Sequence, residues 1–195
     1  MAPRGDALLL TPGAGSGRDQ STLVAVERAL APLPVARVDF PYRIAGRKAP
    51  DRQPVLLETI RVEAAALAQR AGVAPKRVLL GGRSMGGRMC SLAVAEGLAA
   101  AGLVLISYPL HAPGRPDKER SAHFPGLKVP CLFVHGTRDP FGSPEELTTA
   151  TATIVGRVTH VWIEGGRHDL KGADKEVAAA VVKWVGRRAS GGPRG

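Results

Sequence analysis

One ten-residue stretch constrains the fold more than any other part of the chain. Residues 78–87 read Val-Leu-Leu-Gly-Gly-Arg-Ser-Met-Gly-Gly, an apolar β-type run that passes through Gly-x-Ser-x-Gly into a helical pattern. A sharp strand-to-helix turn of this kind lifts a serine hydroxyl clear of the sheet, and the crowding beside it requires the glycines at positions 82 and 86. We therefore predict that Ser84 is a nucleophile. An ordinary glycine-rich turn and a phosphate cradle are the alternatives, although neither nucleotide-binding glycine motif is complete here.

Six short apolar runs predict the strands of one sheet, and helical patterns separate most of them, as in a parallel sheet. The runs cover residues 7–10, 35–40, 77–81, 102–107, 130–135 and 159–163.

Three helices have clear sequence signals. Residues 54–71 place Val55, Thr59, Val62 and Ala66 on one stripe, which we expect to be the apolar face. Ser143, followed by Pro-Glu-Glu, is a capping signal for a helix start. The last helix is expected over residues 174–185, with its tryptophan packed on the sheet.

Two side chains that could activate the serine lie on loops after later strands. Asp139 follows the run 130–135, and His168 follows the run 159–163. Because the carboxyl ends of parallel strands meet at one edge of the sheet, we expect both side chains to converge on Ser84. An imidazole can remove the serine proton, and a carboxylate can hold the imidazole. Asp139 as a turn-former and His168 as a surface histidine are the alternatives.

Backbone N–H groups that could stabilise a developing oxyanion are expected in two places. Met85 comes directly after the predicted nucleophile and opens a helix. The loop after the first strand, residues 11–17, is rich in glycine and lets its backbone approach a ligand closely. We predict Ala14 as the second donor, with Gly13 or Gly15 next. A phosphate-binding loop is the alternative for this segment.

Taken together, these motifs resemble the α/β-hydrolase superfamily, and more narrowly the small KANL3/Tex30-like group, which is related to the dienelactone hydrolases. The narrower resemblance rests on Thr-Pro-Gly-Ala-Gly at 11–15, Gly-Arg-Ser-Met-Gly-Gly at 82–87, Ser-Tyr-Pro-Leu-His at 107–111 and Gly-Thr-Arg-Asp at 136–139. It implies a triad of Ser84, Asp139 and His168 and no cofactor. Dienelactone hydrolases use cysteine where this chain has Ser84, so their substrate is not transferred. Eukaryotic relatives in the group are associated with scaffolding roles.

The fold class expected from the element order and the resemblance is α/β. We predict a minimal α/β-hydrolase fold, in which a mostly parallel central sheet of about six strands carries helices on both faces and no large lid. A chain of 195 residues with 44% hydrophobic residues can bury one good core. Residues 1–186 are expected to form a single domain, and residues 187–195 a basic, disordered tail.

Without a lid, loops must form the walls of the site. The longest, residues 108–130, includes Pro113 and Arg120 and is expected to border the substrate pocket, with a solvated surface loop as the alternative. A basic stretch at residues 42–48 follows the second strand at the same edge and could favour an anionic substrate. The substrate-pocket residues that we predict are Arg83, Tyr42, Arg43, Tyr108 and His111.

Charge and composition bear on the partners. The net charge of +10 suggests nucleic acid, but no recognised module is present, and 2 Trp, 2 Tyr and 4 Phe leave few rings for base stacking. We predict no nucleic-acid partner. No apolar run approaches the length of a membrane span, and residues 1–6 lead into too short a run for a signal peptide, so a cytoplasmic protein is expected. Cys90 and Cys131 are expected to be buried thiols, and the histidines lack metal-ligand spacing.

The activity that these observations predict is hydrolysis of an ester or thioester of a small molecule through an acyl-enzyme intermediate, with no cofactor and no metal. A peptidase is an alternative within the same chemistry. A noncatalytic interaction or scaffold protein on the same fold is the alternative outside it.

Overall fold

The computed structural model of the protein describes residues 6–112 and 114–190. Pro113 of the expected pocket loop and the last five residues of the expected tail lie outside the described residues, as do residues 1–5. The strands are β1 (Ala7–Thr11), β2 (Val35–Arg37), β3 (Val78–Arg83), β4 (Gly102–Ile106), β5 (His111–Ala112), β6 (Arg115–Glu119), β7 (Cys131–Gly136) and β8 (Val158–Ile163). The helices are α1 (Ser21–Leu30), α2 (Pro41–Ile44), α3 (Gln53–Ala71), α4 (Met85–Ala95), α5 (Pro144–Thr151) and α6 (Asp174–Ser190), with short 3-10 turns at Pro75–Arg77 and Phe124–Gly126.

Six strands form one sheet in the order β2-β1-β3-β4-β7-β8, and every neighbouring pair is parallel. Parallel neighbours need crossover connections, which helices provide between most of these strands. The predicted fold class and the six predicted strands are confirmed, although β2 is only three residues long where six were expected. The carboxyl ends of β3, β7 and β8 therefore lie at the same edge of the sheet.

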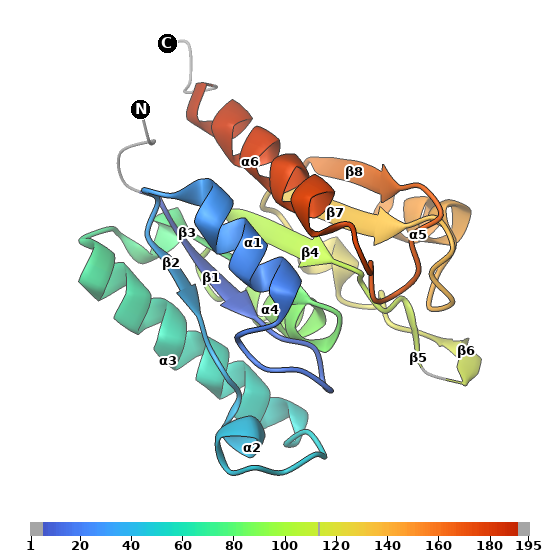
Figure 1. Ribbon diagram of the computed structural model, residues 1–195, viewed down its shortest axis with the longest axis horizontal. Coiled ribbons are helices and arrows are strands. Elements are labelled where there is room, and N and C mark those ends of the chain that lie inside the picture. The colour runs from blue at the N-terminus through green and yellow to red at the C-terminus, as the bar shows by residue number, and fades with distance from the viewer. Residues whose placement is uncertain (1–5, 113, 191–195) are drawn as a thin grey trace.

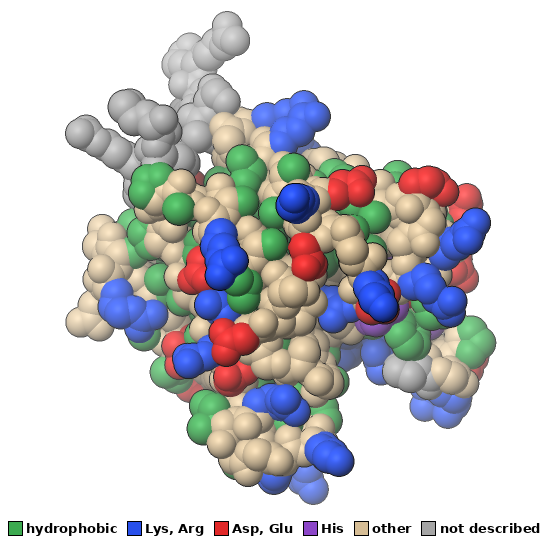
Figure 2. Space-filling model, in the orientation of Figure 1, with side chains coloured by type: hydrophobic (Ala, Val, Ile, Leu, Met, Phe, Trp, Pro, Cys, Tyr) green, Lys and Arg blue, Asp and Glu red, His purple; other side chains and the backbone are tan. Residues whose placement is uncertain are grey.

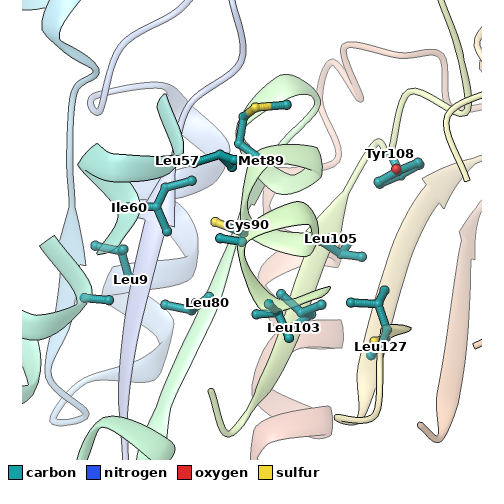
Figure 3. Close-up of a cluster of buried hydrophobic side chains, with 14 of the residues drawn as sticks. Leu9, Leu57, Ile60, Leu80, Met89, Cys90, Leu103, Leu105, Tyr108 and Leu127 are labelled. Carbon is teal, nitrogen blue, oxygen red and sulfur yellow. The ribbon is translucent and has the colours of Figure 1, made fainter. Parts of the chain in front are cut away.

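Helices cover the two faces of the sheet separately. On one face α1 and α6 lie side by side and bury Leu8 and Leu10 of β1 (Figure 1). On the other face α3 and α4 bury Ala7 and Leu9 of the same strand, in a cluster that contains a larger set of leucines (Figure 3) and extends to Leu147 of α5. Side chains alternate between the faces along β1 because the side-chain period of a strand is two. Trp184 of α6 is buried against the first face, as predicted.

The apolar face of α3 differs from the prediction. Val55 and Val62 of the predicted stripe are 44% and 56% exposed, and Thr59 and Ala66 are only partly buried. The buried face instead carries Leu56, Leu57, Ile60, Ala64, Leu67 and Ala68. Both faces of this helix are rich in apolar residues, and the side with the larger leucine and isoleucine side chains is the one that packs on the sheet.

Two further segments differ from their expected secondary structure. Residues 108–130 contain the antiparallel pair β5 and β6 and a 3-10 turn, where a loop without regular structure was expected. Helix α6 continues to Ser190, so the first four residues of the expected tail are helical. The predicted start of α5 is confirmed, because Ser143 and Glu146 form a reciprocal capping box.

On the face seen in Figure 2, positive charge is dispersed. On the face covered by α1 and α6, Lys and Arg side chains alternate with Asp and Glu and do not gather in one band (Figure 2). Within the described ranges, no helix is both long enough and apolar enough to cross a membrane.

Candidate active site

Ser84 lies at the turn between β3 and α4 in a strained backbone conformation. Its φ and ψ angles are 50° and −118°, in a region that non-glycine residues rarely adopt. The Ser84 N–H donates to the carbonyl of Ile106 at 2.8 Å, which ties the turn to β4. A Cβ atom at Gly82 or Gly86 would collide with the backbone of Thr11 in β1. The two glycines of the motif are therefore required by crowding, as the sequence predicts.

Asp139 lies on the loop after β7 and is fully buried at its carboxylate. Oδ1 accepts the N–H of Phe141 at 2.9 Å, which is the turn-forming interaction considered as an alternative. Oδ2 accepts from Nδ1 of His168 at 2.8 Å. The same side chain thus forms the turn and contacts the imidazole, so the two interpretations are compatible.

His168 lies on the loop after β8 and connects the other two side chains. Its Nε2 is 2.8 Å from the Ser84 hydroxyl oxygen, while Nδ1–H donates to Asp139. This arrangement leaves the Nε2 lone pair facing the hydroxyl, as a general base requires. The edge of Phe141 packs on the imidazole, with ring centroids 4.5 Å apart and planes at 86°. The neighbouring Asp169 faces elsewhere and accepts from the N–H of Lys171.

The loops that carry Asp139 and His168 are held against each other by backbone contacts. Arg138 N–H donates to the carbonyl of Gly166 at 2.8 Å, and a Cβ at Gly136 would collide with that same carbonyl. Arg83, directly before Ser84, donates from its guanidinium to the carbonyl of His168 at 2.9 Å. Burial lowers the pKa of Arg83, and nearby aspartates oppose that effect. Arg83 thus braces the histidine loop.

A second imidazole approaches the same carboxylate. His135, at the end of β7, has Nε2 3.6 Å from Oδ2 of Asp139, and its Nε2–H donates to the carbonyl of Gly142 at 2.9 Å. Its Nδ1 is buried with no partner among the described residues. Burial lowers the pKa of His135, and the charge of Asp139 only partly opposes this. The sequence indicated only a structural or surface role for this residue.

The predicted oxyanion donors lie beside the hydroxyl. Met85 and Ala14 both line the cavity that contains Ser84, and a Cβ at Gly13 would lie 3.5 Å from the Cβ of Ser84. Among the described residues, neither the Met85 N–H nor the Ala14 N–H donates a hydrogen bond. The carbonyl of Ala14 accepts from the Tyr42 hydroxyl at 2.8 Å, which fixes the orientation of the loop. Gly15 does not line the cavity.

The cavity beside Ser84 has a volume of about 350 Å³. It lies between the start of α4, the segment before α3, and the residues around Pro109 and Phe141. The five residues predicted for the substrate pocket are not among those that line it. Tyr42 and Tyr108 are buried supports, and the hydroxyl of Tyr108 donates to the carbonyl of Arg120 at 2.6 Å. Arg83 braces His168, and Arg43 follows Tyr42 in α2.

His111, the last of the predicted pocket residues, lies in a different depression. There its Nε2 is 3.1 Å from a carboxylate oxygen of Glu146, and Leu110 and Thr149 are among the neighbours. No group of three or more His, Cys, Asp or Glu side chains in the described ranges is arranged to hold a metal ion.

Several residues of the cavity were not singled out from the sequence. Arg88 and Met89 come from the first turns of α4, and Phe141 from the loop that also carries Asp139. For Arg88 a signal was available in the sequence. It lies four positions, or about one helical turn, after Ser84, so the two residues lie on the same side of the helix. Arg120 also lines the cavity. It belongs to residues 108–130, which were expected to border the substrate pocket.

A family model described as "Alpha/beta hydrolase domain" matches residues 4–184. The match covers the loop of Ala14, the Ser84 turn and both later loops.

Solved structures of esterases and hydrolases have the same fold. Est1E from Butyrivibrio proteoclasticus superposes with a TM-score of 0.76 at 17% identity, covering 96% of this chain and 90% of that one. An alpha-beta serine hydrolase homologue from Coxiella burnetii gives 0.72 at 16% identity, with 94% and 88% covered. The esterase domain of a Rhodothermus marinus protein gives 0.71 at 15% identity, with 93% and 87% covered. At these identities the likeness concerns the fold.

Proposed function

The chain belongs to the alpha/beta hydrolase domain family, and we propose that it is a serine hydrolase that cleaves an ester or thioester bond of a small molecule. One observation carries the proposal. The hydroxyl of Ser84, the imidazole of His168 and the carboxylate of Asp139 are joined by two hydrogen bonds of 2.8 Å each. The strained backbone of Ser84 and its position in a cavity add support, because a strained turn is maintained only where the surrounding structure enforces it.

In the proposed acylation step, the Ser84 oxygen attacks the carbonyl carbon of the substrate while its proton passes to Nε2 of His168. The carboxylate of Asp139 stabilises the imidazolium and keeps Nδ1 protonated. The negative charge on the carbonyl oxygen is stabilised by the N–H groups of Met85 and Ala14, which have no other acceptor among the described residues. His168 then returns the proton to the leaving alcohol or thiol as the carbon–oxygen or carbon–sulfur bond breaks.

Deacylation repeats this sequence with water. His168 removes a proton from a water molecule, whose oxygen attacks the acyl carbon, and the bond to Ser84 breaks as the proton passes to the serine oxygen. The side chain of His168 is 21% exposed, so the base can reach solvent water. No cofactor takes part in this scheme.

The finer assignments belong to the same proposal. The chain is placed in the KANL3/Tex30-like group on the four motifs quoted from the sequence, and the loops at two of them carry Ser84 and Asp139. The small-molecule substrate follows from the volume of about 350 Å³ beside the serine. A cytoplasmic location, a single domain over residues 1–186 and the lack of a nucleic-acid partner stay predictions.

The proposal is tested by labelling the protein with a fluorophosphonate and measuring hydrolysis of short p-nitrophenyl esters and thioesters. We expect one label on Ser84, located by peptide mass spectrometry, and turnover of at least one substrate series. Ser84→Ala should lose both the label and the turnover while keeping the melting temperature of the wild type. Ser21→Ala, which changes an exposed serine at the start of α1, is the matched control and should behave like the wild type.

Two outcomes would contradict the proposal. Labelling at a residue other than Ser84 would reject the assignment of the nucleophile. The lack of both labelling and turnover on esters, thioesters and aminoacyl amides would favour the noncatalytic scaffold.

A further inference from the structure

Two arginines from different elements enter the cavity beside Ser84. Arg88 comes from α4, and Arg120 follows β6 at the point where its N–H donates to the carbonyl of Leu110. Both side chains are partly buried. The proximity of Arg88 contributes to a lowered pKa at Arg120, although burial is the larger cause. The cavity thus holds two like charges near each other.

Within residues 6–112 and 114–190, neither arginine has a carboxylate partner. Six other arginines of the described ranges lie within 4.0 Å of an aspartate or glutamate oxygen, as Arg37 does with Glu27 at 2.7 Å, but neither Arg88 nor Arg120 does. The Nε atom of Arg88 is also buried without any hydrogen-bond acceptor. The hydroxyl of Tyr108 interacts with the Arg88 guanidinium but does not neutralise its charge, as a bound anion would.

The acidic residue in the cavity wall is already engaged. Asp51 lines the same cavity, but its Oδ1 accepts from Arg47 at 2.6 Å and its Oδ2 accepts the N–H of Tyr42 at 2.9 Å. The carboxylate of Asp51 is therefore paired within the segment from α2 to the start of α3. The positive charge of Arg88 and Arg120 remains available to a ligand.

We propose that Arg88 and Arg120 bind a carboxylate group of the substrate, so that the preferred substrates are short esters bearing a carboxylate. The inference rests on the proposed function, since it names the substrate class for the same site. A guanidinium group binds a carboxylate through two parallel hydrogen bonds, which gives both affinity and orientation. The basic stretch at residues 42–48 also led us to expect an anionic substrate. We now assign its binding to Arg88 and Arg120 instead.

The position of Arg88 in the chain bears on the length of the substrate. Arg88 lies four positions after Ser84, and its N–H donates to the Ser84 carbonyl at 3.0 Å in the first turn of α4. That spacing corresponds to about 6 Å along the helix axis. Because Ser84, Arg88 and Arg120 line one cavity of about 350 Å³, we infer that the carboxylate lies within a few bonds of the carbonyl carbon that Ser84 attacks, as it does in a half-ester of a short dicarboxylic acid.

The experiment compares charged and neutral esters of the same length. Monoethyl glutarate carries the carboxylate on the acyl side and 4-acetoxybutanoate carries it on the alcohol side. Each is measured against the analogue in which an amide replaces the carboxylate. We expect kcat/KM for one charged ester to exceed that of its amide by about tenfold or more. Which of the two esters shows the preference identifies the side that the arginines bind.

Three variants test the residues. Arg88→Gln and Arg120→Gln should each lower kcat/KM for the preferred charged ester by about tenfold or more. They should change kcat/KM for the neutral ester, in which an amide replaces the carboxylate, by less than about threefold. Retained turnover of the neutral ester shows that each variant is folded. Arg28→Gln, an exposed arginine on α1, is the matched control and should leave both values unchanged. Equal kcat/KM for the charged and neutral esters in the wild type, or equal losses on both in the variants, would overturn the inference.

A binding measurement separates this inference from the proposed function. In the Ser84→Ala protein, calorimetry should detect tighter binding of the charged ester than of its amide, and adding Arg88→Gln should remove the difference. If the wild type hydrolyses and labels nothing but this difference is present, the proposed hydrolase fails and the carboxylate site stands. If Ser84→Ala binds both esters equally or binds neither, the carboxylate site is rejected, whether or not the wild type is a hydrolase.

Discussion

Two imidazoles approach the carboxylate of Asp139 from different sides, and their surroundings differ. His168 lies 2.8 Å from Oδ2 with its side chain 21% exposed, and its other nitrogen contacts the Ser84 hydroxyl. His135 lies 3.6 Å from the same oxygen with its side chain 1% exposed, and its contact nitrogen also donates to the carbonyl of Gly142. His168 therefore connects the carboxylate to a cavity, whereas His135 connects it to the protein interior.

Their surroundings determine which of the two rings can act as a general base. A general base must reach both the proton it removes and the water that replaces the product, which His168 can do. The second nitrogen of His135 is buried with no hydrogen-bond partner among the described residues, and burial lowers the pKa of the ring, which favours its neutral form. We expect His168 to determine activity and His135 to determine stability. The following predictions test that division, beginning with the largest effect.

Removing the base or its orienting charge should have the largest effect on activity. We expect His168→Gln to lower kcat by a factor on the order of 10⁵ to 10⁶ and Asp139→Asn by about 10³- to 10⁴-fold. The asparagine keeps the shape of the side chain but cannot stabilise the imidazolium. Ester hydrolysis and circular dichroism are measured on both variants. A folded Asp139→Asn protein with nearly full activity would remove Asp139 from the mechanism.

His135→Gln should separate the two imidazoles. We expect it to lower the free energy of unfolding by about 1–3 kcal/mol, because the hydrogen bond to Gly142 and the packing against Trp162 are lost. The value of kcat should change by less than about tenfold, since no atom of His135 contacts the hydroxyl. Urea unfolding and steady-state kinetics provide the two measurements. A loss of kcat as large as that of His168→Gln would mean that both rings belong to the catalytic machinery.

The pH dependence of stability should also follow the buried ring. Burial lowers the pKa of His135 below the value of about 6.5 for an unfolded chain. As the pH falls through about 6.5, the unfolded state therefore binds a proton that the folded state does not, and the free energy of unfolding decreases. This stability is fully present above that pH.

We expect His135→Gln to flatten the decrease below pH 6.5 in thermal unfolding experiments. His123 contributes to the same decrease, because burial and the charge of Arg88 lower its pKa to about 4. Its part of the decrease in the free energy of unfolding therefore continues down to about that pH. An unchanged pH slope in the His135→Gln protein would show that folding does not lower the pKa of His135.

The smallest effect is expected at the ring that packs on His168. Phe141→Leu removes an edge-to-face aromatic contact at 4.5 Å while keeping the N–H that Asp139 accepts. Such a contact contributes about 0.5–1.5 kcal/mol, so we expect kcat/KM to fall by about two- to tenfold. Steady-state kinetics on a short neutral ester measures the change. A loss of about 10³-fold would indicate that Phe141 has a larger role than orienting the imidazole.

The sequence predicted the positions of Ser84, Asp139 and His168 at one edge because each follows a buried apolar strand. Parallel strands bring their carboxyl ends together whatever the details of the helices, so this part of the geometry depends on local signals. The structure brings the three side chains within hydrogen-bonding distance. Their role in catalysis remains a proposal.

Other features depended on packing between distant segments and could not be predicted locally. The sequence of α3 offers two apolar faces, and contact with the sheet selects the one with Leu56 and Ile60. Tyr42 was expected in the pocket, but its side chain is buried and its hydroxyl donates to the carbonyl of Ala14. Arg88 and Arg120 line the same cavity although they come from distant segments, α4 and the residues after β6. The pairing of β5 with β6 lies between them in the chain, and no periodicity in the sequence indicates it.

The contact between Gly136 and the carbonyl of Gly166 has a consequence for how such a chain could change over time. A single methyl group at position 136 would force the two loops apart and separate the carboxylate from the imidazole, without altering the serine turn or the arginines of the cavity. The descendant would keep all three reactive residues in its sequence and would bind esters without cleaving them. Under the proposed function, one glycine at the start of the loop that carries the carboxylate therefore decides between an enzyme and a receptor.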